Sequence, residues 1–129
     1  NVVQIEAFAS LFDGLSIGSN DLTQLVLGVD RDSDIVAFDF DERDPGVLEM
    51  LRQAVEGAHC AGRPIGVCGE APATYPEIAE FLTHLGVDSL SVNPQSLGRT
   101  LATVASAEAA RASRPGSRSH RTVGGTARR

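Results

Sequence analysis

Three neighbouring polar side chains follow a short apolar run near the start of the chain. The run Gly14-Leu-Ser-Ile-Gly18 predicts a buried strand, and Ser19, Asn20 and Asp21 stand before a helical pattern begins. Free backbone N–H groups at such a turn bind anions, and a carboxylate beside them suits a hard cation such as Mg²⁺. Two local roles stay open, because Asp21 can also cap the helix and Asn20 can also shape the turn.

A lone arginine stands among acidic residues in the following segment, Val29-Asp-Arg-Asp-Ser33. The guanidinium of Arg31 can bind a phosphate group through two parallel hydrogen bonds. It can equally form an ion pair on the surface, which contributes little to stability. The residue types do not decide between these two roles.

A cysteine ends a second apolar run, Ile65-Gly-Val-Cys68, which predicts a second buried strand. The thiol of Cys68 can act as a nucleophile or as a proton donor, or it can be a small buried apolar group. His59 and His84 fall in helical sequence, away from Cys68, so proton transfer fits better than acyl transfer. Glu70 can orient the thiol, bind a polar substrate group, or only shape the loop.

These side chains need strands and helices to position them, and the chain alternates between the two. Asp44 before Pro45 predicts a helix start, and Gly62 and Gly86 predict helix ends. We expect strands at residues 14–17, 64–68 and 89–92, and helices at residues 5–12, 21–28, 45–60, 76–85 and 93 to about 111. Cys60 falls near a helix end, where we expect it to pack against the core as a free thiol.

The alternation of strands and helices predicts an α/β fold with parallel strands and right-handed crossovers. The 129 residues allow one domain at most. Three such units form either part of a doubly wound sheet or a sector of a (β/α)8 barrel, which as a whole takes about 250 residues.

Charge divides the chain into an acidic body and a basic tail. Residues 1–110 hold all 17 acidic side chains and five of the 11 basic ones, whereas residues 111–129 hold six Arg. The acidic body argues against nucleic acid as a partner, because phosphate binding needs clustered cations. The tail lacks apolar periodicity, so we expect disorder there; contact with nucleic acid or an acidic surface is the alternative.

No apolar run approaches the roughly 20 residues that cross a bilayer, and no N-terminal signal segment is visible. We therefore expect a cytoplasmic protein without a membrane partner. Because the chain starts at Asn1 without Met, we also expect it to be a piece of a longer protein.

Four phrases, in order along residues 1–105, resemble the C-terminal barrel of enzymes that use phosphoenolpyruvate (PEP). They are Gly18-Ser-Asn-Asp-Leu-Thr-Gln-Leu25, Gly28-Val-Asp-Arg-Asp-Ser33, Gly66-Val-Cys-Gly-Glu-Ala-Pro72 and Gly86-Val-Asp-Ser-Leu-Ser-Val-Asn-Pro94. The first two phrases are most similar to the PEP synthase (pyruvate, water dikinase) branch. Other branches usually read Gly-Thr-Asn-Asp in the first phrase.

The resemblance implies that residues 1–110 are the last three β/α units of a (β/α)8 (TIM) barrel, with the disordered tail at residues 111–129. It implies the reaction of ATP, pyruvate and water to AMP, PEP and phosphate, with Mg²⁺ as cofactor and a homodimer formed through the barrel of the whole enzyme. The matching positions carry the roles over. Gly18, Ser19, Asn20 and Asp21 bind pyruvate or PEP, Asp21 also binds Mg²⁺, Arg31 binds phosphate, and Cys68 exchanges a proton with enolpyruvate.

The sequence also departs from the family pattern. A second Mg²⁺ ligand of the family, a Glu in a Cys-Glu-Ile-Pro-like phrase, belongs before Asn1, and Glu6 does not match it. The substrate arginines of earlier strands, the ATP-grasp domain and the phosphohistidine domain have no counterpart in this sequence. A non-catalytic remnant or an oligomerisation module is therefore the alternative function.

Overall fold

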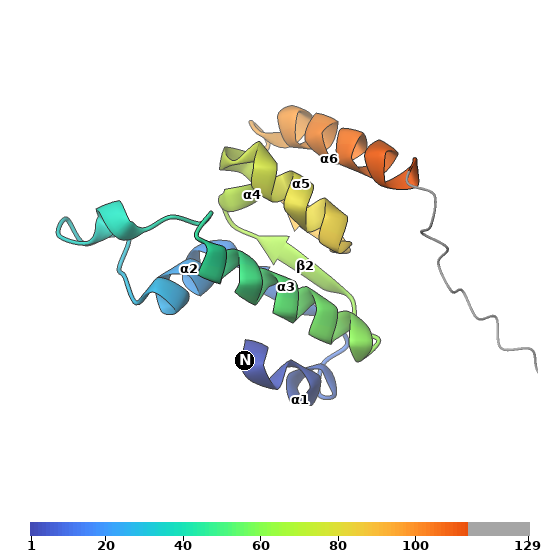
Figure 1. The fold of residues 1–129 in the computed structure, drawn as a ribbon, viewed down its shortest axis with the longest axis horizontal. Helices are drawn as coiled ribbons and strands as arrows, with labels where there is room; N and C mark the ends of the chain where they lie inside the picture. The colour runs from blue at the N-terminus through green and yellow to red at the C-terminus, as the bar shows by residue number, and fades with distance from the viewer. Residues whose placement is uncertain (114–129) are drawn as a thin grey trace, which may run out of the picture.

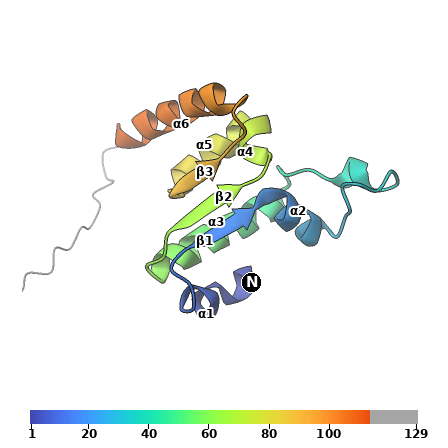
Figure 2. The same ribbon diagram turned by 180° about the vertical axis from the view of Figure 1, so that it is seen from behind.

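The computed structural model describes residues 1–113 (Figure 1) and has a three-stranded parallel sheet at its centre, whose strands Figure 2 shows side by side. The strands β1 (Leu15–Gly18), β2 (Ile65–Cys68) and β3 (Ser89–Ser91) lie side by side in sequence order. Both strand pairs are parallel. The expected α/β fold with parallel strands is confirmed, and each strand end lies within one residue of its expected position.

Helices precede the first strand, connect the strands and follow the last one. The helical elements are η1 (Val2–Gln4), α1 (Ile5–Ala9), α2 (Ser19–Leu27), η2 (Ala37–Asp39), α3 (Pro45–Cys60), α4 (Ala71–Thr74), α5 (Pro76–Leu85) and α6 (Leu97–Ala112). None of the helices within residues 1–113 has the length and apolar character needed to span a membrane. The basic tail expected at residues 111–129 lies outside the described residues from residue 114 onwards.

Local signals account for the helix ends that the sequence predicts correctly. The Asp44 side chain accepts a hydrogen bond of 2.7 Å from the Gly46 N–H and so caps α3 at the expected place. Gly86 ends α5 with φ +86°, a left-handed conformation that glycine adopts without a Cβ clash.

Two expected helix bounds and the expected burial of one side chain are wrong. The last helix begins at Leu97 rather than near residue 93, because a tighter turn precedes it: the Ser96 N–H donates both to the Asn93 carbonyl and to Asn93 Oδ1. The first helix ends at Ala9, so Phe12 lies outside it. Cys60 is a free thiol as expected, but it is exposed rather than packed in the core.

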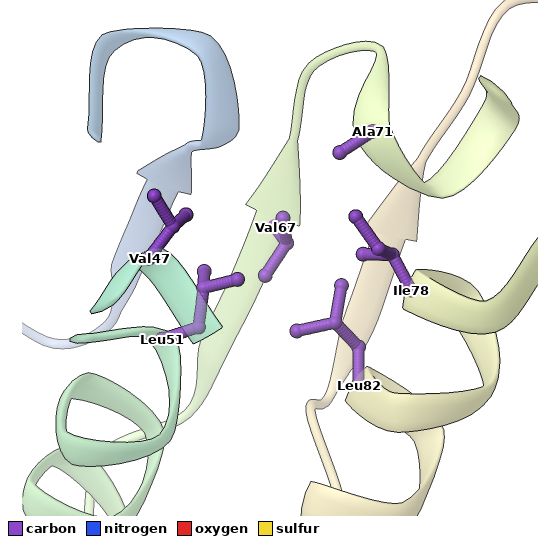
Figure 3. Close-up of a cluster of buried hydrophobic side chains, with 6 residues drawn as sticks. All are labelled: Val47, Leu51, Val67, Ala71, Ile78 and Leu82. Atoms are coloured by element: carbon purple, nitrogen blue, oxygen red, sulfur yellow. The ribbon is translucent and has the colours of Figure 1, made fainter. Parts of the chain in front are cut away.

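The core lies between one face of the sheet and two helices. Val67 of β2 contacts Leu51 of α3 and Leu82 of α5 in the main apolar cluster, which Figure 3 shows. A second cluster joins the C-terminal half of α3 to Ile65. Burying such side chains stabilises the fold by about 1.5–3 kcal/mol each, so helices α3 and α5 fix the sheet from one side.

The opposite face of the sheet carries small polar side chains. Ser16, Cys68, Ser89 and Ser91 are exposed there, and Figure 2 shows no helix of the described chain over this face. Parallel sheets are usually covered on both faces. The exposed polar face is therefore the side from which a ligand or further chain can reach the sheet.

A polar contact ties the amino ends of β2 and β3 to the end of α3. The Asp88 carboxylate accepts a 2.8 Å hydrogen bond from the Ile65 N–H and lies 3.0 Å from His59 Nε2. Both contacts lower the pKa of Asp88, and the hydrogen bond from Ile65 has the larger effect. This contact holds the end of the sheet that lies opposite Cys68.

Replacing Asp88 by alanine should lower the melting temperature at pH 7, and the difference from wild type should narrow as the pH falls towards 3. The folded-state pKa is lowered, so the carboxylate contributes stability above its unfolded pKa of about 4 and loses it as the pH falls through the folded value. Circular dichroism melts at several pH values measure this. Asp88→Asn, which keeps an acceptor for Ile65, should fall in between, and a pH-independent difference for Asp88→Ala would contradict the account.

Candidate active site

The strand register brings two chemically active turns to one edge of the sheet. Gly18 at the end of β1 pairs directly with Cys68 at the end of β2, and Cys68 pairs with Ser91 of β3. The β1–α2 turn and the β2–α4 turn therefore leave the sheet side by side. Ligands of open α/β folds bind at this carboxyl edge of the strands.

Ser19 anchors the β1–α2 turn inside the protein. It is the first residue of α2 and is 2% exposed. Its hydroxyl donates a 2.8 Å hydrogen bond to Glu42 Oε1, and its carbonyl accepts one of 2.8 Å from the Thr23 hydroxyl. The start of α2 is thus fixed by the Thr23 side chain of the same helix and by the Glu42 side chain of the loop before α3.

Gly69 allows the β2–α4 turn to pack directly against the β1–α2 turn. Its φ is +128°, and a Cβ there would lie 2.3 Å from Ser19 Oγ and 3.0 Å from Asn20 Oδ1. The next residue, Glu70, donates its backbone N–H to Asn20 Oδ1 at 3.2 Å. Any side chain at position 69 would push the two turns apart.

The contact with Glu70 orients the Asn20 amide. Because Asn20 Oδ1 accepts the Glu70 N–H, the amide cannot turn freely, and its NH₂ group points to the other side. Among residues 1–113, this NH₂ group donates to no acceptor. An amide NH₂ held in this way can donate to a carbonyl or carboxylate oxygen of a ligand. Asn20 therefore shapes the turn, and its NH₂ group stays available as a donor.

Asp21 does not cap α2. The N-cap position is Gly18, without a side-chain hydrogen bond, and Asp21 is exposed in the first helical turn. Its carboxylate lies over Gly18, since a Cβ there would be 3.0 Å from Asp21 Oδ2. The helix dipole favours negative charge at this place, and the carboxylate is accessible to a cation.

Cys68 is exposed, so it is not a buried apolar group. The Ser16 hydroxyl donates a weak hydrogen bond to Cys68 Sγ over 3.6 Å, along the bare face of the sheet. An accessible thiol beside a hydroxyl can transfer a proton to a ligand above the sheet.

Arg31 lies apart from the two turns in the contacts that the structure records. Its N–H donates to Gln24 Oε1 at 3.1 Å, and its Nε lies 3.9 Å from the Asp32 carboxylate. That pair is exposed, and such pairs contribute about 0–1 kcal/mol. Of the predicted site residues, Gly18, Ser19, Asn20, Asp21 and Cys68 meet at one edge, whereas Arg31 makes no hydrogen bond to them.

Glu42 is the residue of this region that the sequence analysis misses. It is 5% exposed, although it stands in the charged stretch Asp41-Glu-Arg-Asp44, which has the pattern of a solvated loop. Burial raises the pKa of Glu42, and the hydrogen bond from Ser19 opposes this increase. No local pattern distinguishes Glu42 from its acidic neighbours, because its partner lies 23 residues earlier.

The donor set fits part of a magnesium site. Among the described residues, no three His, Cys, Asp or Glu side chains gather as metal ligands. Mg²⁺ is commonly held by one or two carboxylates together with substrate oxygens and water. Asp21 supplies one accessible carboxylate, so further ligands have to come from a substrate or from chain outside residues 1–113.

Comparison with known proteins decides the family. Residues 1–109 match the model of the PEP-binding domain of PEP-utilising enzymes. The chain belongs to this family. Its relatives include phosphoenolpyruvate synthases from Synechocystis sp. (56% identical over 110 residues), Helicobacter pylori (51% over 108 residues) and Aquifex aeolicus (48% over 108 residues).

These matches cover 84–85% of this chain but 13% of each relative. The chain thus spans about an eighth of the length of these PEP-utilising relatives. The two turns that meet at the carboxyl edge fall within the matched residues. The expected resemblance to the PEP synthase branch is confirmed.

Replacing Gly69 by alanine should destabilise the protein by about 2–4 kcal/mol, because overpacking against Ser19 adds to the cost of a positive φ. Gly62→Ala is the matched control. Gly62 also has a positive φ, +69°, but nothing lies within 4 Å of its added Cβ, so the loss there should be about 1 kcal/mol. Urea unfolding measures both. Equal losses would show that the two turns do not press on each other at Gly69.

Proposed function

We propose that residues 1–110 form the C-terminal sector of the PEP- and pyruvate-binding domain of a PEP synthase-type phosphotransferase. The whole enzyme would convert ATP, pyruvate and water into AMP, PEP and phosphate. The observation that carries this proposal is the pairing of Gly18 with Cys68, which sets the Asn20–Asp21 turn beside an exposed thiol. The names of the relatives support the same reaction.

Each residue at the edge suits one part of this chemistry. PEP that has lost its phosphoryl group is enolpyruvate, which becomes pyruvate when its methylene carbon gains a proton. The Cys68 thiol would deliver that proton, and its thiolate would remove it in the direction of synthesis. The Asn20 NH₂ group would hold a substrate oxygen, and Arg31, which lies on a loop, would bind the phosphate.

Asp21 would supply one Mg²⁺ ligand. The ion, when bound, would stabilise negative charge on the substrate oxygens. Asp21 has the accessibility and the position at a helix N-terminus for this role. The remaining protein ligand would come from chain beyond the described residues.

The exposed surfaces of the sheet support a barrel as the complete fold. Hollows of about 360 Å³ beside β1 and about 270 Å³ beside β3 flank its two edges. Leu25 next to the first hollow and Leu101 next to the second are largely exposed. Further β/α units pairing with β1 and β3 would cover these side chains, and the face with Ser16 and Cys68 would become the barrel interior.

A non-catalytic remnant is the second candidate, favoured because no three potential metal ligands gather among the described residues. Transplantation distinguishes the two. In a chimera, residues 1–110 of this chain replace the matching segment of the Synechocystis phosphoenolpyruvate synthase, which is 56% identical. We expect the chimera to form PEP from pyruvate and ATP. A folded chimera without turnover would favour the remnant.

In the active chimera, Cys68→Ala should lower kcat by about 10²–10⁴-fold, because a positioned general acid contributes that much. The matched control is Cys60→Ala, since Cys60 is also an exposed free thiol but lies at the end of α3. That variant should keep wild-type turnover. Steady-state assays of PEP formation measure both, and unchanged kcat in Cys68→Ala would refute the role of the thiol.

A further inference from the structure

A buried carboxylate contacts the candidate active site without belonging to either of its turns. Glu42 lies on the segment that leads from Arg31 to α3, and its Oε1 accepts the hydrogen bond from Ser19. It is 5% exposed, and Ser19 is 2% exposed. The contact is therefore shielded from water and joins two segments that are far apart in the sequence.

The Ser19 hydroxyl has one proton and two possible acceptors, and the carboxylate of Glu42 is the closer one. Ser19 Oγ lies 2.8 Å from Glu42 Oε1 and 3.1 Å from Asn20 Oδ1. A hydroxyl donates one hydrogen bond at full strength, and an ionised carboxylate is a stronger acceptor than an amide oxygen. With its proton directed to Glu42, Ser19 ties the first turn to the loop before α3, while Asn20 Oδ1 in the same turn accepts the Glu70 N–H.

Stability alone does not explain a carboxylate at this position. Burial of an acidic group costs free energy unless it is paired, and the charges around Glu42 oppose one another. Glu70 and Asp41 disfavour its ionised form, whereas Arg31 favours it. An apolar side chain of similar size would fill the space without this cost.

We propose that Glu42 is a positioning residue for the proposed reaction. Through Ser19 it holds the Asn20–Asp21 turn against the Gly69–Glu70 turn, and so sets the ligand groups relative to Cys68. It also fixes the end of the loop that carries Arg31. This role rests on the proposed function for its catalytic consequence, but the link between the turns can be measured without it.

The link is tested first on the 129-residue chain by amide hydrogen exchange. Glu42→Ala and Ser19→Ala should each raise the exchange rate of the Glu70 N–H by about tenfold, the effect of one lost hydrogen bond. Glu42→Gln should stay near wild type, because its amide oxygen still accepts from Ser19. The Gly86 N–H, at the end of α5, is the internal reference and should not change.

The consequence for the reaction is tested in the chimera by a double-mutant cycle. Glu42→Ala and Ser19→Ala should each lower kcat/KM by about tenfold or more, and the double variant should lose no more than the worse single one. Val55→Ala is the control for stability. This substitution opens a cavity in the second apolar cluster, in which Val55 packs with Ile65. It should lower the melting temperature and leave kcat/KM unchanged.

The outcomes separate this proposal from the proposed function. Additive losses in the cycle, or a Glu70 N–H that exchanges at the wild-type rate in Glu42→Ala, would overturn the role of Glu42. Loss of kcat/KM in Glu42→Ala with rescue by Glu42→Gln would support it. If the wild-type chimera is inactive, the proposed function fails, and the exchange rates of Glu42→Ala and Glu42→Gln still decide whether Glu42 links the turns.

Discussion

The parallel register of β1 and β2 is the constraint on which the other features depend. A slip of one residue would turn Val67 away from Leu51 and Leu82 and would direct Cys68 towards the helices. The apolar contacts of the core therefore fix the register, and the register in turn sets Cys68 beside Gly18. Packing on one face of the sheet thus determines the chemistry available at its carboxyl edge.

At the carboxyl edge of the sheet, one backbone conformation and one buried charged group each cost free energy. Gly69 takes a left-handed conformation against Ser19, and Glu42 is a buried carboxylate with a raised pKa. The opposite end of the sheet instead has the contact of Asp88 with Ile65 and His59. Strained or desolvated groups are common where a ligand has to be held, so the contrast between the two ends is consistent with a site at the carboxyl edge.

The sequence predicts those parts of the fold that local signals determine. Asp44 and Pro45 mark the start of α3, and Gly86 marks the end of α5, because caps act within one turn. The start of α6 is missed, since Asn93 and Ser96 close a tight turn before the helix, and the sequence does not separate this turn from a first helical turn. Glu42 is missed for a different reason. Its burial depends on a partner brought close only by tertiary structure, which no local pattern reveals. The roles of Asp21, Arg31 and Cys68 come from family resemblance and remain predictions.

The central claim is that Cys68 and the turn at Ser19–Asp21 share one edge of the sheet. Nuclear Overhauser contacts between β1 and β2 in the 129-residue chain test it most directly. Backbone cross-peaks should link Gly18 to Cys68, with a further contact between the Glu70 N–H and the Asn20 side chain. Cross-peaks that link Gly18 to Gly66 in place of Cys68 would contradict the account.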